Sequence, residues 1–167
     1  YYDNLRAFSQ PHLRECQLRQ LEILKVIDAI CQKHGIGYWL DGGTLLGAVR
    51  HGGFIPWDDD IDIAMDYQDM MRFAEIAPGE LPEGLFLQSP KTDPGVKEQM
   101  VKVRDLNSLY IEKGDNFVVD YVKGIYVDIF PFEAHPDIPK KWTKRLAKGI
   151  TKSISILHHP HTYSLRA

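Results

Sequence analysis

The sequence predicts a mixed α/β domain of the α+β class, with a mixed β-sheet flanked by helices. Two patterns predict this class: apolar residues with helical spacing dominate the first 34 residues, and short strand-like runs dominate the region after residue 84. Between them, strand and helix patterns alternate. The chain has 167 residues, of which 44% are hydrophobic and 26% charged, so one domain with a hydrophobic core is expected.

Residues that typically begin or end helices and strands define the expected elements. Ser9-Gln10-Pro11 predicts the beginning of a long helix, because serine caps helices and proline fits the first turn, and His34-Gly35 predicts its end. Further helices are expected over 45–50, over 67–76 (ended by Pro78-Gly79) and from 140 onward. Strands are expected over 38–40, 60–65, 85–87, 100–104, 109–111 and 125–130, the last ended by Pro131.

Charge is distributed unevenly. From Lys140 onward there are seven Lys or Arg residues and no Asp or Glu, which leaves 13 basic and 23 acidic residues in 1–139. An acidic body argues against duplex nucleic acid as a partner and suits a site that needs cations. We expect 1–137 to form the main domain and 138–167 to be a basic amphipathic segment, an incomplete part of the same domain.

Cysteine spacing and hydropathy bear on the compartment. Cys16 and Cys31 lie in one expected helix, roughly 22 Å apart at its rise per residue, too far for a disulfide. They are interpreted as core residues in a reducing compartment. No apolar run approaches the roughly 18 residues of a transmembrane helix. The chain begins at Tyr1 and shows no secretory pattern, so targeting is not readable.

The acidic run Asp58-Asp59-Asp60-Ile61-Asp62 is the strongest chemical signal. On a strand, Asp60 and Asp62 point to one face, about 6.5–7 Å apart, where they can share one cation. Asp58 shares their parity, and Asp59 is expected to face the other way. Like charges so placed repel one another unless a cation neutralises them. The alternative is a solvated acidic turn after Pro56.

Two further elements could complete such a site. Gly42-Gly43-Thr44 stands before an expected helix, where glycines let a phosphate approach and free N–H groups attract an anion; an ordinary glycine turn is the alternative. Asp128 is a lone acid in an apolar strand, which is costly to bury unless it meets a cation or hydrogen-bond donors. If its strand lies beside the Asp60–Asp62 strand, the three carboxylates meet. An edge position facing water is the alternative for Asp128.

Basic side chains could hold phosphates. Arg50 ends the helix after the glycines, and Lys102 and Arg104 share one strand face. Each could equally form a surface ion pair. Histidines at 158, 159 and 161 are interpreted as a local tail feature rather than a zinc site.

Two competing acidic motifs each differ from this sequence at one position. An EF-hand loop requires glycine where this chain has Ile63. A haloacid-dehalogenase phosphatase has threonine or valine where this chain has Ala64. Glycosyltransferases that hold a nucleotide sugar through Asp-x-Asp and a divalent metal remain an alternative.

The stretch YWLDGGTLLGAVRHGGFIPWDDDIDIAM at 38–65 resembles the signature of the LicD family, which includes the fukutin-related proteins. The segments KVRD at 102–105 and YVDIFPF at 126–132 resemble later blocks of that family, so the resemblance covers about residues 10–135. It implies a nucleotidyltransferase core of the polymerase-β type.

The resemblance also implies roles for residues. Gly42, Gly43 and Thr44 would form the substrate-phosphate turn, and Asp60, Asp62 and Asp128 would be catalytic residues holding Mg²⁺ or Mn²⁺. Arg50, Lys102 and Arg104 are expected to bind substrate.

The implied reaction moves phosphocholine or a similar phospho-alcohol from a CDP-linked donor to a hydroxyl of a cell-surface glycan or teichoic acid precursor and releases CMP. It would take place in the cytoplasm, at the inner face of a bacterial membrane, with peripheral membrane contact through the basic segment. A glycosyltransferase and a non-catalytic glycan- or nucleotide-binding domain remain the alternatives.

Overall fold

The computed structural model describes residues 2–96, 101–111, 120–134 and 139–158, with side chains described within 12–150. The chain divides into two compact units, residues 1–133 and 134–167, which are described separately. The described elements follow the order α1 (Tyr2–His34), β1 (Trp39–Leu40), α2 (Gly42–His51), β2 (Asp62–Asp66), α3 (Tyr67–Glu80), β3 (Leu85–Gln88), β4 (Val101–Asp105), β5 (Tyr126–Phe132) and α4 (Lys140–His158). The predicted α+β class with a mixed sheet is confirmed.

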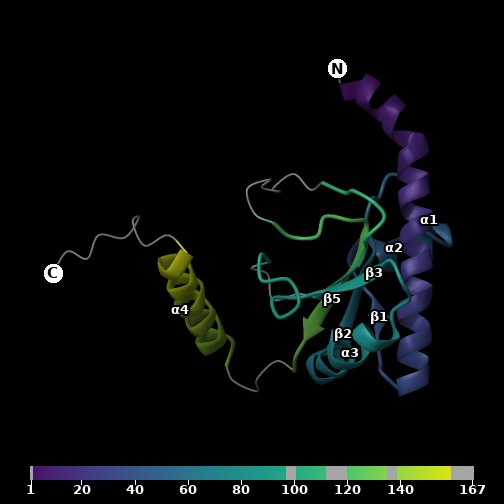
Figure 1. The fold of residues 1–167 in the computed structure, drawn as a ribbon. Helices are drawn as coiled ribbons and strands as arrows, with labels where there is room; N and C mark the ends of the chain where they lie inside the picture. Colours follow the sequence, from purple (N-terminus) through teal and green to yellow (C-terminus); the bar gives the residue numbers. More distant parts are fainter. Residues whose placement is uncertain (1, 97–100, 112–119, 135–138, 159–167) are drawn as a thin grey trace. The chain divides into compact units, whose positions relative to one another are not determined.

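The five strands form one sheet in the order β1-β2-β5-β4-β3 (Figure 1). β2 and β5 are parallel, and the other neighbouring pairs are antiparallel. The parallel pair lies at the centre of the sheet, so β5 is hydrogen-bonded to β2 on one side and to β4 on the other.

One face of the sheet forms the hydrophobic core. Alternate residues of β2, β4 and β5 meet the apolar sides of α1 and α3 there, because side chains along a strand point to opposite faces. Ile63, Phe73 and Ile129 are fully buried in this cluster. Cys16 and Cys31 are buried free thiols on α1, as expected from their spacing.

The opposite face carries a row of polar side chains across four strands. The strand register places Asp62 opposite Asp128, Asp128 opposite Lys102, and Lys102 opposite Gln88. Residues that face one another across paired strands point to the same side of the sheet. Lys102, Asp128 and Gln88 are buried, so this row must satisfy its charges and hydrogen bonds within the protein.

Several predicted helix boundaries were wrong. α1 begins at Tyr2 rather than at Ser9, since Leu5, Arg6 and Ala7 are strong helix formers that continue it across Pro11. α2 begins at Gly42, three residues before its expected beginning. α3 runs to Glu80 through Pro78, which lies within its last turn.

Two strand predictions also differ from the structure. The expected strand at 109–111 is absent. The backbone N–H of Tyr110 instead donates a hydrogen bond to the carbonyl oxygen of Lys123, and the ring of Tyr110 lies edge-on to the ring of Tyr126. Pro131 does not end β5: it lies opposite Met65 of β2, past the point where the pairing with β4 stops at Ile129. Proline is tolerated there because, among the residues that the structure describes, this end of β5 pairs with β2 alone.

Candidate active site around Asp58–Asp62

The acidic residues lie in a loop that leads into β2. β2 begins at Asp62, so Asp58, Asp59 and Asp60 precede the strand. The expected alternation therefore does not apply to them, and one oxygen from each of the three lies within 4.8 Å of the others. The prediction that Asp59 faces away from its neighbours was wrong, because alternation of side chains requires strand geometry.

Helix α1 holds the backbone of this acidic loop. The side-chain amide of Gln17 donates to the carbonyl oxygens of Asp58 at 2.8 Å and Ile55 at 3.4 Å. The amide of Gln20 donates to the carbonyl oxygen of Asp59 at 2.8 Å. Both glutamines are buried, so these bonds form away from water. Neither contact was predicted from the sequence, although two glutamines three apart on the apolar side of a helix are an unusual pattern.

The glycine turn packs directly against the acidic residues. A Cβ atom at Gly43 would lie 2.6 Å from a carboxylate oxygen of Asp58, and one at Gly42 would lie 3.2 Å from a carboxylate oxygen of Asp62. Gly42 also has a φ of 50°, which side chains other than glycine's rarely allow. The turn and the acidic loop are therefore in close contact, and their common role in a site stays a prediction.

Thr44 and Asp41 join the glycine turn to β2. The Thr44 hydroxyl accepts a hydrogen bond from the backbone N–H of Asp62 at 2.9 Å, and the N–H of Asp41 donates to the carbonyl oxygen of Asp62 at 3.0 Å. Asp41 caps α2 without a hydrogen bond from its side chain. The first N–H groups of a helix have no partner within the helix, so this end of α2 is suited to an anion.

The carboxylates destabilise one another's charged forms. Burial, followed by the charges of Asp60 and Asp128, raises the pKa of Asp62 to about 6. Burial and neighbouring aspartates also raise the pKa of Asp58 and of Asp60. A cation within reach of these oxygens would remove the repulsion, which is the physical reason to regard them as a metal site.

Asp128 lies on β5, which pairs with β2. The two strands are therefore neighbours, which was the condition expected from the sequence for Asp128 to approach the other carboxylates. Its carboxylate oxygens are 3.1 Å and 3.4 Å from the ammonium of Lys102 on β4. The same ammonium lies 3.9 Å from the centre of the Tyr126 ring. The buried acid therefore meets a cation of the protein itself, which satisfies the condition for burying it.

The other two basic candidates differ in their surroundings. The Arg104 guanidinium is buried and donates to the side-chain oxygen of Gln88 and, at 2.8 Å, to the carbonyl oxygen of Gly124. Arg50 is exposed in the last turn of α2. Their binding to substrate stays a prediction. Histidines 159 and 161 lie outside the described residues, and His158 is described only as backbone.

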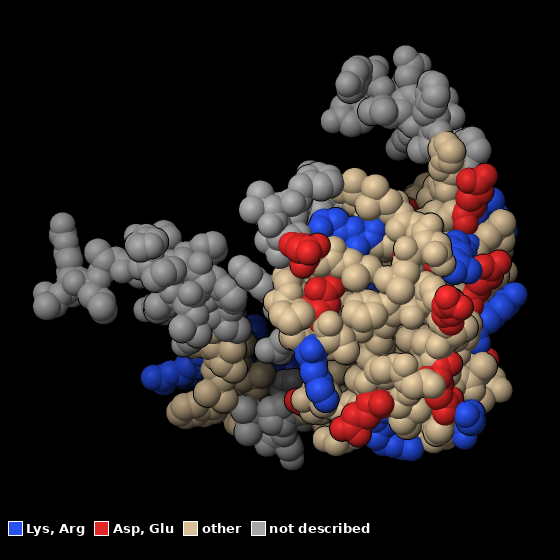
Figure 2. Space-filling view, viewed as in Figure 1, with Lys and Arg blue, Asp and Glu red and all other residues tan. Residues whose placement is uncertain are grey.

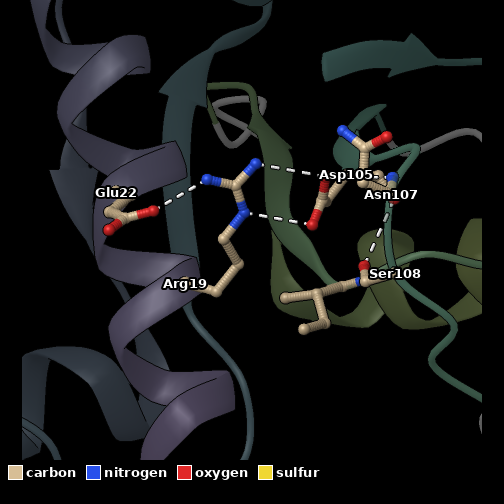
Figure 3. A network of polar contacts seen from close by, with 6 residues as sticks. Arg19, Glu22, Asp105, Asn107 and Ser108 are labelled. Atoms are coloured by element: carbon tan, nitrogen blue, oxygen red, sulfur yellow. Dashed lines mark hydrogen bonds and ion pairs between the residues drawn. The ribbon is translucent and has the colours of Figure 1, made fainter. Parts of the chain in front are cut away.

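A second polar network braces the end of β4 (Figure 3). The Arg19 guanidinium on α1 donates to both carboxylate oxygens of Asp105, at 3.0 and 3.1 Å, and to Glu22 at 2.7 Å. The N–H of Asn107 donates to the same carboxylate at 3.1 Å. Although burial raises the pKa of Asp105, these hydrogen bonds outweigh it and hold that pKa below its usual range. The network joins α1 to the loop after β4.

A groove opens beside the acidic loop. It has a volume of about 620 Å³ and is lined by α1, by Asp59, and by Leu109, Tyr110 and Ile125. The Tyr110 hydroxyl donates to a carboxylate oxygen of Asp59 at 2.8 Å. In Figure 2, acidic and basic side chains are interspersed over the side of the molecule that α1 crosses. The groove is large enough for part of a small-molecule substrate.

Comparison with known proteins identifies relatives. The family model described as LicD/FKTN/FKRP, nucleotidyltransferase domain, matches residues 35–162. The lipopolysaccharide cholinephosphotransferase LicD of Haemophilus influenzae is 36% identical over 130 residues, which are 77% of this chain and 47% of that protein. The human ribitol 5-phosphate transferase FKRP is 33% identical over 121 residues, 70% of this chain and 21% of its own length. Mannosyltransferase regulator 4 of Saccharomyces cerevisiae is 26% identical over 121 residues, 70% of this chain and 10% of its own. The chain thus spans less than half the length of these relatives.

Proposed function

Because the chain belongs to the LicD/FKTN/FKRP nucleotidyltransferase family, we propose that it is a phosphotransferase that moves a phospho-alcohol from a CDP-linked donor to a hydroxyl group. Two relatives bear the names of transferases for phosphocholine and ribitol 5-phosphate, which supports this class of reaction. The observation that carries the proposal is the packing of Gly42 and Gly43 against the carboxylates of Asp62 and Asp58. It brings an anion-binding turn and an acidic cluster to one point.

The donor phosphates would lie at the first turn of α2. The backbone N–H groups of Gly42, Gly43 and Thr44 belong to that turn, and glycines leave room for phosphate oxygens beside them. Arg50 would approach from the last turn of the same short helix. Its planar guanidinium can bind two phosphate oxygens at once.

The acidic residues fit a hard divalent cation, Mg²⁺ or Mn²⁺. Asp60, Asp62 and Asp128 would hold it, and the close approach of oxygens from Asp58, Asp59 and Asp60 supports a loop that can gather several ligands. The ion would neutralise charge that develops on the transferred phosphoryl group. The raised pKa of Asp62 supports the assignment, because it reflects burial of the carboxylate and then the negative charge of Asp60 and Asp128 beside it.

The proposed step is an in-line substitution at the β-phosphorus of the donor. The acceptor oxygen forms a bond to phosphorus, the bond to the CMP oxygen breaks, and the product is a phosphodiester. Asp128, which lies beside Asp62 in the strand register, would either accept the proton of the acceptor hydroxyl or hold the metal that makes this hydroxyl more acidic. Positioning and charge neutralisation do most of the work in such transfers.

The groove beside Asp59 would hold the uncharged part of a substrate. Leu13, Leu109 and Ile125 give it apolar walls, and Tyr110 offers a ring on which a sugar or a base can pack. We place the body of a glycan acceptor here, since the donor phosphates are assigned to the start of α2. The acceptor would be a surface glycan or a teichoic-acid-type precursor.

A panel of CDP-alcohols tests the proposal. The protein is incubated with each donor, a glycan acceptor and Mg²⁺, and CMP is measured by mass spectrometry. We expect CMP release with at least one donor, and its loss in the Asp62→Asn variant. A nucleoside diphosphate released from a nucleotide sugar would instead support the glycosyltransferase alternative.

A non-catalytic role is the second candidate. It is favoured by the yeast relative, whose name is that of a regulator rather than a transferase. Binding of a CDP-alcohol without any release of CMP would support this candidate.

The helix α4 supports a peripheral contact with an anionic membrane. Within its described residues, Trp142, Leu146 and Ile150 are exposed and stand four apart, and its first turn has no acidic residue. Lysines lie around this apolar stripe, so the helix complements an anionic lipid surface in both charge and polarity. None of the described helices has the length and apolar character needed to cross a bilayer.

Sedimentation with liposomes tests this contact. Vesicles containing anionic lipid should carry the protein down, less so as salt rises, while vesicles of neutral lipid should not. Changing Lys140, Lys141, Lys144 and Lys148 to glutamine should abolish the effect. Absence of binding at low salt would assign the stripe to packing within the protein.

A further inference from the structure

Lys102 is a cation that stands beside the acidic site. Its ammonium is 3.1 Å and 3.4 Å from the two oxygens of Asp128, and both side chains are at least nine-tenths buried. The pair lies beside Asp62, which is opposite Asp128 in the strand register.

A second support holds the ammonium in this place. It lies 3.9 Å from the centre of the ring of Tyr126, which is paired with Arg104 in the register of β4 and β5. A cation over an aromatic face is stabilised without a carboxylate partner. Lys102 can therefore give up its contact with Asp128 and remain bound to the ring.

The same oxygens cannot serve both cations fully. An ammonium at hydrogen-bond distance occupies the lone pairs that a divalent ion would use, and two cations so close repel each other. A buried acid without either cation would be strongly destabilising. The site thus needs one cation at all times, and Lys102 is the one that the chain carries with it.

We propose that Lys102 is an internal counter-ion that competes with the divalent metal for Asp128 and stays on the Tyr126 ring when the metal binds. This inference rests on the metal site of the proposed function. It makes Lys102 a positioning residue for Asp128.

Thermal unfolding at a series of Mg²⁺ concentrations tests the competition without any turnover. In chelator, Lys102→Met should lower the melting temperature, because Asp128 loses its partner. Added Mg²⁺ should restore much of that loss. The midpoint, defined as the Mg²⁺ concentration that gives half of the rise in melting temperature, should be about tenfold lower than for the wild type, within the usual range of coupling between two ligands. Lys33→Met is the matched control, since it breaks the exposed Lys33–Glu80 pair on another part of the protein, and its midpoint should not change.

A second background covers the case in which Lys102→Met does not fold. Asp128→Asn removes the carboxylate charge, and the double variant Lys102→Met/Asp128→Asn replaces the charged pair by neutral groups of similar size. Because the competition acts through Asp128, adding Lys102→Met to Asp128→Asn should leave the Mg²⁺ midpoint within about twofold. A tenfold fall in this background would overturn the inference in favour of general repulsion by the lysine charge.

An equal loss of stability with and without Mg²⁺, together with an unchanged midpoint, would make the pair purely structural and overturn the inference. If the wild type itself gains no stability from Mg²⁺ or Mn²⁺, the metal site fails and the inference fails with it.

Discussion

Asp62 and Asp128 lie directly opposite each other on the two parallel strands at the centre of the sheet. Their side chains point to the same face, and the charge of Asp128 contributes to the raised pKa of Asp62. A parallel pair of this kind places two residues far apart in sequence at neighbouring positions near the beginnings of their strands. The arrangement accounts for a site assembled from an acidic loop and a distant strand.

Removing one charge from the acidic site should separate activity from stability. Asp62→Asn should abolish CMP release, because a carboxylate ligand is lost. In chelator at neutral pH the same variant should be more stable than the wild type, by up to about 3 kcal/mol, since the pKa of Asp62 is raised to about 6 and a tenfold change in acidity corresponds to about 1.36 kcal/mol. Chemical denaturation in chelator, alongside the activity assay, measures both. Full activity of the variant would exclude Asp62 as a ligand.

A methyl group at Gly43 should disturb the site with little effect on the fold. The added Cβ would lie 2.6 Å from an oxygen of Asp58, whose flexible side chain can move away. Gly43→Ala should therefore weaken Mg²⁺ binding and turnover, while the free energy of unfolding changes by less than about 1 kcal/mol. Gly53→Ala is the control, because nothing lies within 4 Å of a Cβ atom there. Equal metal midpoints in the two variants would contradict the prediction.

Loss of the Gln20 amide should loosen the acidic loop. Gln20→Leu keeps the apolar packing of α1 but removes the hydrogen bond to the carbonyl oxygen of Asp59. We expect a loss of stability of about 1–3 kcal/mol, as for other buried groups left without a partner, together with weaker Mg²⁺ binding. Gln32→Leu removes an exposed bond on the same helix and should alter neither. A variant that binds the metal as the wild type does would show that α1 has no part in positioning the loop.

The Arg19–Asp105 pair predicts a pH dependence of stability. The pKa of Asp105 is depressed in the folded protein, so its contribution is present above the unfolded pKa of about 3.9 and is lost as the pH falls through the folded value. Asp105→Asn should therefore cost about 1–3 kcal/mol at neutral pH, and the difference from the wild type should shrink below about pH 4. Urea unfolding at several pH values provides the test. A difference that stays constant down to about pH 2 would assign the effect to packing.

The two arginines should respond differently to replacement by lysine. Arg104→Lys removes the fork of donors that serves Gln88 and Gly124, so its main effect should be on stability, by about 1–3 kcal/mol. Arg50→Lys should leave stability unchanged and raise the KM for the donor, because its exposed guanidinium is assigned to a phosphate. Melting curves and steady-state kinetics of both variants separate the two roles. A normal KM in Arg50→Lys would show that Arg50 does not bind the donor.

The class of fold and the strands that carry the site were readable from periodicity. The alternation of acid and aliphatic residues at 60–65 and the apolar run around Asp128 both predicted strands that the structure contains. The sequence alone could not predict that these two strands are neighbours. The structure shows it in the parallel pairing of β2 and β5. The geometry of Asp58 to Asp60 was not predictable from strand spacing, because these residues lie before the strand begins.

Long-range contacts account for what the sequence did not predict. Gln17 and Gln20 reach a loop about 40 residues away, and local periodicity carries no information on such a contact. The pairing of Lys102 with Asp128 depends on the antiparallel register of β4 and β5. Tyr110, expected in a strand, instead contributes its hydroxyl to Asp59.

Helix α1 has a consequence for where the boundary of the folded unit should be drawn. The family model begins at residue 35, one residue after α1 ends, so a boundary drawn from family similarity excludes the whole helix. Such a fragment would keep every carboxylate and glycine of the site but lose the two amides that hold the acidic loop and the apolar side chains that cover the sheet. A shortened version of the protein, or a domain transplanted into another chain, must therefore carry this preceding helix, which lies outside the match to the family model.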